Sequence, residues 1–386
     1  GIAREGNETK KKQCLKLLGL EQFSPGHHFG ASHSESRIYH HAYFEHSDYV
    51  SLLLYSTAVF QDIQRNYTTN RLIHSCGTLL VDREDDDDFS IVRKSIESAS
   101  IYNIHVVPMS ATELQHAYPF FHVSDSSFRG VLEPTGGFVC PELAIQLALK
   151  DAVSSDAIVD IRYHTTVLSI EPHSEHSVAL TVQTGNTVQC YSANRVIVAA
   201  GAWTSTLLPS FTPHLRITRQ IQAWFEPLDQ SIIDWFYTCP TWYLCRGKEL
   251  PGLYGIPCRP YLQQPWYKVA LHGREDPIHD DPVENAKRAP STNELEELHE
   301  ALAEWMQFVH SLPCTYTSTI DNHFVLETNV PGFPKHTICC IAGLSGHGFK
   351  MVPALGKAAA DLVWTGTTDL PVEFLRGNRF HDTTSL

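Results

Sequence analysis

The sequence predicts an α/β (or α+β) fold, in one large domain or in two closely joined domains. Segments of strand character and segments of helix character alternate along the chain, which is the pattern of these architectures. The 386 residues, 42% of them hydrophobic, are enough to bury a sizeable core. No run approaches the roughly 18 consecutive apolar residues of a membrane helix, so we expect no membrane partner.

Helices are predicted where apolar residues recur at helical spacing behind a polar or proline start. One such segment spans 49–64, and a second begins at Pro141 and runs to 153. A third, 291–313, opens with Ser291 and Glu294, which have the spacing of a capping box. Its apolar face is expected to lie in the core and comprises Leu295, Leu298, Leu302, Trp305 and Val309.

Strands are predicted where β-branched or aromatic residues form short runs between turn residues. The first run, 14–23, is interpreted as a buried strand that ends in an acid, Glu21. Further strands are expected at 164–172, at 177–184 and within 186–201. More strands are expected in the aromatic stretch 215–276.

Charge and cysteine usage argue against several classes of function. The formal net charge of -14 disfavours a nucleic-acid partner, because such proteins need a basic face for phosphates. The acidic run Asp85–Asp88 is interpreted as a solvated loop. The ten cysteines form no CxxC pair and no metal-finger spacing, so we expect no metal site. This usage favours a reducing, intracellular compartment.

Two separate pieces of the chain indicate nucleotide binding. The segment 195–209 reads as a strand, the turn "AGAW" with Gly201 and Trp203, and the start of a helix. A glycine lets the backbone approach a ligand closely, and helix N-termini attract phosphates. Glu21 has the place of the acid that binds a ribose hydroxyl in dinucleotide folds, although an ordinary strand-end acid is the alternative. Residues 1–13 do not contain the strand–GxGxxG–helix unit that such folds place about twenty residues earlier.

Four polar stretches each allow a structural and a functional interpretation. The segment 30–45 is rich in histidine and serine and is either a surface loop or part of a site. Lys268 and His272 lie on one side of a predicted strand, facing solvent or a cavity. Cys314 reads by default as a buried structural thiol. The run "GHGFK", 346–350, is either a tight turn or the wall of an active site, with a helix expected from 353 to about 364.

Together, the stretches that carry these residues resemble the flavin-dependent amine oxidases of the D-amino-acid-oxidase superfamily. The resemblance extends from about Leu15 to Arg379 and is strongest to the branch of monomeric sarcosine oxidase and peroxisomal sarcosine (L-pipecolate) oxidase. The segments that carry it stand in family order: "LLGLEQF", "GASHSESRI", "EPTGGFV", "VIVAAGAWT", "YKVALHG", "CTYTSTIDNHF" and "AGLSGHGFKMVPALGK".

The resemblance implies two domains built from discontinuous segments. A Rossmann-like FAD-binding domain would comprise 1–45, 130–210 and 310–386, without its first strand and glycine loop. A mixed-sheet substrate domain would comprise 46–129 and 211–309. The implied reaction is the oxidation of a secondary (N-methyl, cyclic or N-substituted) amino acid to an imine, while oxygen is reduced to hydrogen peroxide.

The family's cofactor-binding positions fall on residues of this chain. Cys314 corresponds to the thiol that binds FAD covalently through a thioether, and Glu21 to the ribose acid. Val167 belongs to the strand whose backbone meets the adenine. The remaining cofactor positions are His33, Arg37, Gly201, Trp203, Gly346 and Gly348.

The family's catalytic positions can be carried over in the same way. Lys268 corresponds to the lysine that promotes reaction with oxygen, and Lys350 to the lysine that holds the substrate carboxylate. His347 lies in the same turn as Lys350, and Tyr254 and His272 are expected to line the substrate cavity. His40 stands where the family has an arginine beside Lys350, so we expect a weaker carboxylate clamp.

The resemblance leaves three functional hypotheses open. The favoured one is an active oxidase of which this chain is a fragment or a mis-spliced form, because Cys314, Lys268 and Lys350 coexist. The others are a catalytically impaired relative and a flavin dehydrogenase. We expect a monomer with an amino acid and oxygen as partners. Its location is expected to be peroxisomal or cytoplasmic, because the C-terminal Thr-Ser-Leu is only a weak import signal.

Overall fold

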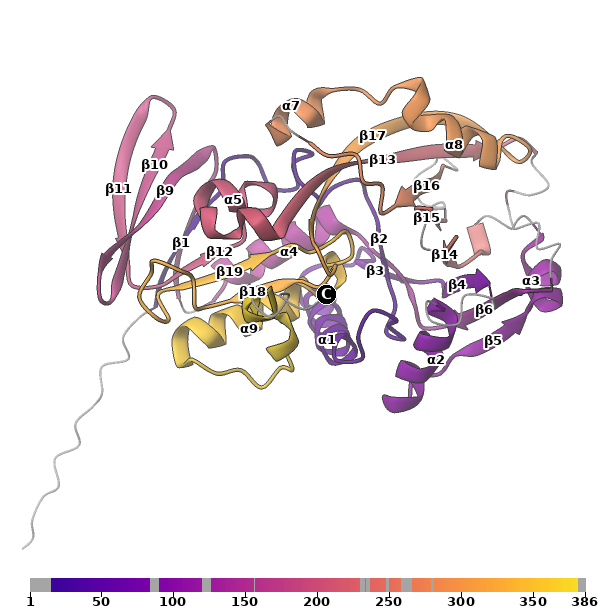
Figure 1. The fold of residues 1–386 in the computed structure, drawn as a ribbon, viewed down its shortest axis with the longest axis horizontal. Helices are drawn as coiled ribbons and strands as arrows, with labels where there is room; N and C mark the ends of the chain where they lie inside the picture. Colours follow the sequence, from indigo (N-terminus) through magenta and orange to yellow (C-terminus); the bar gives the residue numbers. More distant parts are fainter. Residues whose placement is uncertain are drawn as a thin grey trace, which may run out of the picture.

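The computed structural model describes residues 15–83, 90–119, 126–155, 157–229, 233, 237–247, 250–257, 266–278 and 281–380. The run Asp85–Asp88, the segment before 15 and the C-terminal tripeptide lie outside these residues. Helices and strands alternate along the described chain (Figure 1), so the predicted α/β class is confirmed.

The largest sheet is mixed and lies at one end of the molecule, under α8 (Figure 1). β14 pairs with β4 in parallel, and the neighbouring pairs are antiparallel. In sheet order its strands are β17 (Met306–Thr319), β13 (Leu215–Pro227), β16 (Tyr267–His272), β15 (Gly252–Ile256), β14 (Thr241–Leu244), β4 (Thr78–Arg83), β6 (Phe128–Glu133) and β5 (Val107–Ser110).

Smaller sheets occupy the other end of the molecule. Two of them contain parallel pairs, β1 (Lys16–Leu20) with β8 (Ile158–Arg162), and β12 (Val196–Val198) with β19 (Ile338–Ala342), as a Rossmann-like domain requires. β18 (Val325–Glu327) completes the second sheet. A meander and a short sheet add β9 (Thr165–Ser174), β10 (Ser177–Thr184), β11 (Thr187–Ala193), β2 (Arg37–Tyr39), β7 (Gly137–Val139) and β3 (Ile73–Ser75).

The predicted helices at 49–64, 141–153 and 353–364 are present. α1 (Tyr49–Tyr67) and α9 (Val352–Thr365) pack together over a core that includes Leu52 and Leu355 (Figure 1). The other helical elements are α2 (Ile91–Ile101), α3 (Ala111–Ala117), α4 (Pro141–Val153), η2 (Gly201–Trp203), α5 (Thr204–Leu207), η3 (Pro209–His214), α7 (Pro282–Lys287), α8 (Thr292–Leu302), η5 (Phe349–Met351), η6 (Glu373–Leu375) and η7 (Gly377–Phe380). None of the described helices has the length and hydropathy of a membrane span.

The predicted long helix over 291–313 is only half correct. The capping box of Ser291 and Glu294 is formed, and Leu295, Leu298 and Leu302 are buried as expected. The helix ends at Leu302, however, and β17 begins at Met306 and pairs with β13 along its whole length. Val309 therefore lies in a strand, because this long antiparallel pairing overrides a helical pattern that a short apolar run cannot distinguish.

The first predicted strand is present, but its expected burial is wrong. β1 ends just before Glu21, yet Leu17 is 48% exposed and Leu18 is 38% exposed. Among the described residues β1 pairs only with β8, and a two-stranded sheet gives these side chains little to pack against. The proposed division into two domains stays a prediction.

Candidate functional site

Lys268 is the second residue of β16 and points into the protein. It is 3% exposed, and its Nζ donates to the carbonyl oxygens of Ser34 (2.9 Å) and Ser36 (2.7 Å). The solvent-facing alternative is therefore wrong. A buried ammonium needs acceptors, and here it obtains them by fixing the segment that carries His33 and Arg37.

The segment 30–45 is an inner wall of the protein rather than a surface loop. Ser34 and Glu35 adopt left-handed backbone angles (φ 73° and 66°), and Arg37 donates to the carbonyls of Ser36 (2.8 Å) and Ala31 (2.6 Å). His33 is 3% exposed, with Nδ1 2.6 Å from the Ser34 hydroxyl and Nε2 buried without a partner. Burial, followed by the charge of Arg37, lowers the pKa of His33 to about 3, so the ring is neutral.

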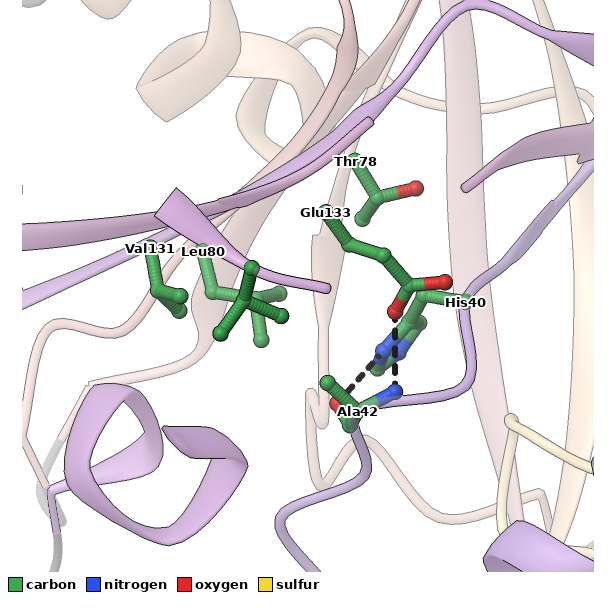
Figure 2. Close-up of a pocket in the computed structure, with 7 residues that line it drawn as sticks. His40, Ala42, Thr78, Leu80, Val131 and Glu133 are labelled. Atoms are coloured by element: carbon green, nitrogen blue, oxygen red, sulfur yellow. Dashed lines mark hydrogen bonds between the residues drawn. The ribbon is translucent and has the colours of Figure 1, made fainter. Parts of the chain in front are cut away.

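Glu133 anchors the next part of this segment (Figure 2). Its carboxylate accepts hydrogen bonds from the backbone amides of His41 and Ala42 (2.8 Å each) and lies 2.8 Å from His41 Nδ1. Figure 2 shows the bond from the Ala42 amide. His40 is buried beside it and donates from Nδ1 to the carbonyl of Ala42 (2.9 Å). Burial and then the charge of Lys350 lower the pKa of His40, so this ring is neutral near pH 7. The adjoining cavity of about 10 Å³ has room for one water.

The run "GHGFK" forms a turn whose shape requires its glycines. Gly346 has φ 77°, and a Cβ there would lie 2.2 Å from the ring of Tyr316. Ser345 fastens the turn: its hydroxyl donates to the carbonyl of Gly343 (3.0 Å) and accepts from the amide of Thr319 (3.3 Å). A Cβ on Gly348 would lie 2.6 Å from Leu344.

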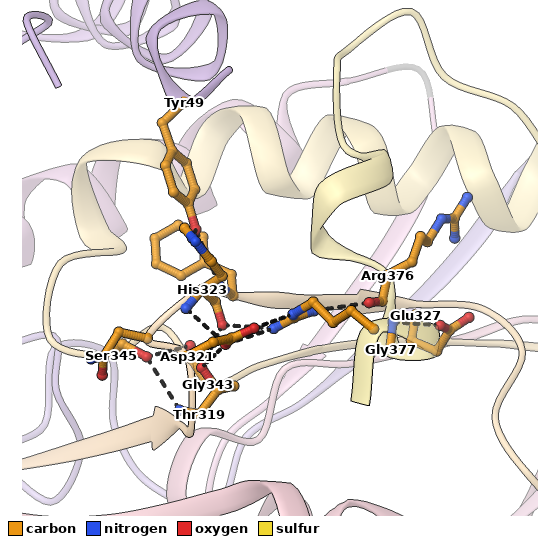
Figure 3. Close-up of polar contacts among 12 residues, drawn as sticks. Tyr49, Thr319, Asp321, His323, Glu327, Gly343, Ser345, Arg376 and Gly377 are labelled. Atoms are coloured by element: carbon orange, nitrogen blue, oxygen red, sulfur yellow. Dashed lines mark hydrogen bonds and ion pairs between the residues drawn. The ribbon is translucent and has the colours of Figure 1, made fainter. Parts of the chain in front are cut away.

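The turn is tied to the end of β17 by a wider polar network (Figure 3). Thr319 donates from its hydroxyl to Asp321 (2.9 Å), and Arg379 forms an ion pair with the same carboxylate (2.6 Å). The turn and β17 are therefore held as one unit.

Lys350 and His347 converge on a tyrosine that the sequence did not indicate. The hydroxyl of Tyr43 lies 2.7 Å from His347 Nδ1 and 3.4 Å from Lys350 Nζ. His347 Nε2 donates to the carbonyl of Asn322 (3.1 Å), so Nδ1 accepts from Tyr43, and Tyr43 accepts from Lys350. Burial, and then the charge of Lys350, lower the pKa of His347 and keep it neutral.

Glu45 is a second residue that the sequence did not indicate at this position. Its Oε1 lies 3.9 Å from His347 Nδ1. Both Tyr43 and Glu45 lie at the end of the segment 30–45, in "YFE", but only the fold shows that these two residues reach the "GHGFK" turn.

Cys314 and Tyr254 both lie near Tyr316, a tyrosine on β17. Cys314 is a free thiol, 3% exposed, opposite Gln220. Burial raises the pKa values of Tyr254 and Tyr316, and Cys314 lies close enough to contribute to both. His272 Nδ1 lies 3.2 Å from the Tyr316 hydroxyl, and burial lowers the pKa of His272 to about 4. Tyr316 was missed because only the fold brings β15, β16 and β17 together.

The remaining predicted cofactor positions form a separate group near β1. The carboxylate of Glu21 accepts from the amide of Phe23 (2.8 Å), whose ring centre lies 5.8 Å from that of Trp203. Gly201 has φ 52°, and a Cβ there would meet nothing within 4 Å, which leaves the backbone open to a ligand. Val167 lies in β9 opposite Val182 and is partly buried.

Two observations support FAD binding by the predicted cofactor residues. The buried Nε2 of His33 lacks a partner that a ligand would provide, and the open backbone at Gly201 is a place where a phosphate or ribose would fit. His33, Lys268 and Cys314 would hold the flavin ring, and Glu21 and Gly201 the nucleotide end. These individual roles remain predictions.

Comparisons with known proteins bear on the family and the fold. A family model described as FAD dependent oxidoreductase (DAO) matches residues 10–362. Monomeric sarcosine oxidase from Streptomyces avermitilis is 28% identical over 365 residues, which cover 92% of this chain and 89% of the relative. N-methyl-L-tryptophan oxidase from Yersinia pestis is 27% identical over 359 residues, covering 90% and 88%.

Solved structures share the fold at lower sequence identity. NikD, an unusual amino acid oxidase essential for nikkomycin biosynthesis, has a TM-score of 0.74 at 18% identity and covers 94% of this chain and 91% of that chain. L-Proline dehydrogenase from P. horikoshii has a TM-score of 0.73 at 16% identity, with coverage of 95% and 91%. The expected fold class is confirmed.

Proposed function

The chain belongs to the family of FAD dependent oxidoreductases, and from that premise we propose that it oxidises a secondary amino acid. The substrate would be N-methyl, cyclic or otherwise N-substituted, the organic product an imine, and the reduced product of oxygen hydrogen peroxide. Relatives named as sarcosine and N-methyltryptophan oxidases support this proposal. The observation that carries it is the Lys350 ammonium, placed beside a neutral Tyr43–His347 pair in a buried wall.

Lys350 would bind the carboxylate of the substrate. An ammonium next to neutral hydrogen-bonding groups in a dry site attracts an anion more strongly than it does in water. His40 cannot supply a second cation near neutral pH, because its pKa is lowered. The carboxylate would therefore depend on Lys350 alone, whereas the aromatic residues Tyr254 and Tyr316 would flank the remainder of the substrate.

FAD, when bound, would supply the redox chemistry, in which the C–H bond gives up a hydride and the nitrogen gives up a proton, so that two electrons and two protons in all reach oxygen as hydrogen peroxide. The chain's own residues prepare that chemistry. Lys268 would keep a fixed positive charge where oxygen gains negative charge, which stabilises the developing anion. Tyr254 and His272 would exclude water, and both are neutral because burial opposes their charged forms.

The test is a substrate panel with two readouts. Sarcosine, pipecolate, proline and a glycated amino acid are offered, and peroxide in air and flavin bleaching without air are measured. The proposal expects both signals with at least one N-substituted amino acid and neither with Lys350→Met at the same concentration. Bleaching without peroxide would indicate a dehydrogenase instead. The absence of both signals across the panel contradicts the proposal.

Covalent attachment through Cys314 is tested by colour. We expect the protein precipitated in acid to retain its yellow flavin, and Cys314→Ala to release the flavin into the supernatant. Cys190→Ala is the control, because that cysteine is exposed and lies on β11, outside the candidate site. Equal release from both variants, or from the unmodified protein, contradicts the assignment.

A further inference from the structure

Glu45 has a carboxyl oxygen that the fold leaves unexplained. The residue lies between β2 and α1, its side chain is 18% exposed, and its Oε2 is buried without a hydrogen-bond partner. Its other oxygen has His347 Nδ1 at 3.9 Å, and that nitrogen already accepts from Tyr43. A buried carboxylate oxygen without a partner is costly, so a proton or a ligand is needed to satisfy it.

The groups around Glu45 come from several elements. Four are uncharged, and the first of them is also a hydrogen-bond partner of the Glu45 carboxyl group: Tyr43, Tyr49 on α1, Tyr243 on β14 and His347 in the turn. The cations that act on it are Lys350 and, more weakly, Lys94 on α2.

Two buried carboxyl groups act electrostatically on Lys350, one that is already satisfied and one that is not. Glu133 also acts on Lys350, but its oxygens are occupied by the amides and ring of the 41–42 segment. Glu45 is thus the carboxyl group that can change its charge state opposite Lys350. Burial raises the pKa of Glu45, which makes its protonated form accessible near neutral pH, and Lys350 only partly offsets this rise.

We propose that Glu45 takes up a proton when the carboxylate of the substrate binds to Lys350, so that the anion and one proton enter the site together. This inference rests on the proposed function, because it assumes a carboxylate at Lys350. One ammonium cannot balance two carboxylates in a site from which water is excluded. The proton comes from solvent and forms an O–H bond on Glu45, and no other bond changes.

The proton also supplies a missing hydrogen bond. Protonated Glu45 becomes a donor, and its buried oxygen can then face the anion instead of repelling it. With His40 neutral, a second cation is not available. Because His40 gives the site no second cation, the protonation of Glu45 balances the charge of the bound carboxylate instead.

This coupling has a definite pH signature. Above the pKa of Glu45, each bound anion requires one proton, so the affinity falls by about tenfold per pH unit. Below that pKa, Glu45 is already protonated and the affinity is flat. In Glu45→Gln the neutral form is permanent, so the affinity stays flat until Lys350 loses its proton.

The experiment is calorimetric titration with (methylthio)acetate, which has the carboxylate but no amine proton to titrate. Binding enthalpies at pH 8 in buffers of different ionisation enthalpy give the number of protons taken up. We expect a larger uptake in the unmodified protein than in Glu45→Gln, which should bind at least as tightly. Because burial lowers the pKa of Lys350 to about 8, Lys350 adds a fraction of a proton in both proteins at pH 8, and this fraction shrinks toward pH 7. Glu275→Gln is the matched control, because Glu275 is 81% exposed and pairs with Arg216 at the surface. It should take up the same proton as the unmodified protein.

The outcomes separate this inference from the proposed function. Equal proton uptake by the unmodified protein and Glu45→Gln between pH 7 and 9, or no uptake by either, overturns the role of Glu45 and leaves the substrate proposal intact. Failure of (methylthio)acetate to bind, together with no peroxide or bleaching from the substrate panel, overturns both. Should Glu45→Gln fail to fold, the unmodified titration still decides whether a proton enters, and Glu45→Asp should retain the uptake.

Discussion

Lys268 combines a structural and a chemical role in a single residue. Its Nζ holds the carbonyls of Ser34 and Ser36, and its charge would stabilise oxygen as it is reduced. We predict that Lys268→Met slows reoxidation by oxygen by about 100-fold or more, the loss typical of removing one fixed charge-stabilising group, and slows substrate reduction far less. Stopped-flow measurements of the two half-reactions decide this. The control is Lys287→Met, an exposed lysine on α7. Equal losses in both half-reactions would leave Lys268 with its structural role only.

Tyr43 connects the two polar residues of the "GHGFK" turn. Its hydroxyl donates to His347 and accepts from Lys350, and the ring is 1% exposed. We predict that Tyr43→Phe lowers the free energy of unfolding by about 1–3 kcal/mol, because it leaves His347 Nδ1 buried without a donor. Urea unfolding measures the change, with Tyr163→Phe as the control because no described residue bonds that hydroxyl. An unchanged midpoint would mean that His347 finds another donor.

At the scale of an element, the turn between β19 and α9 depends on Gly346 for two reasons. Its φ of 77° strains any other residue, and an added Cβ would lie 2.2 Å from the Tyr316 ring. Gly332 is a matched control, because it has φ 84° but open space around its Cβ. We predict that Gly332→Ala costs about 1 kcal/mol of unfolding free energy from backbone strain alone, and Gly346→Ala at least twice that together with most of the activity. Equal costs would show that Tyr316 moves aside freely.

Some helices and strands could be predicted from the sequence, and others could not. α4 and the capping box of α8 were predictable because their signals are local: a proline at the first position and a serine–glutamate pair three residues apart. The first part of β17, residues 306–313, was predicted as helix because its partner β13 lies some ninety residues earlier in the chain. In the site, Lys268 and Lys350 stood in recognisable stretches. Tyr316 also lies in a quoted stretch, "CTYTSTIDNHF", but its place beside Tyr254 and His272 depends on how three strands align.

For the whole molecule, the buried neutral histidines predict sensitivity to acid. Burial lowers the pKa of His33 to about 3 and of His272 to about 4, and His40 and His347 shift in the same direction. In the unfolded chain these rings take up protons near their ordinary pKa of 6.5, so below that value the unfolded state binds more protons than the folded state. Stability is therefore complete above about pH 6.5 and falls as the pH drops toward the folded pKa values.

The size of this loss of stability in acid follows from the difference in the number of protons that the folded and unfolded states bind. Each such histidine contributes about 1.4 kcal/mol per pH unit below 6.5. Burial raises the pKa of Glu45 to about 7, so this group takes up a proton in the folded state over the same range and offsets one histidine. The free energy of unfolding should still fall by several kcal/mol between pH 7 and pH 5. Glu133 adds to the fall only below its ordinary pKa of 4.5, because hydrogen bonds from the 41–42 segment hold its folded pKa near 2. Urea titrations at half-unit steps from pH 7.5 to 4.5 measure the slope, and His272→Phe should flatten it by about one proton. A profile without a slope between pH 6.5 and 5 would mean that these histidines become charged within the folded protein, and their neutral assignment in the site would then be wrong.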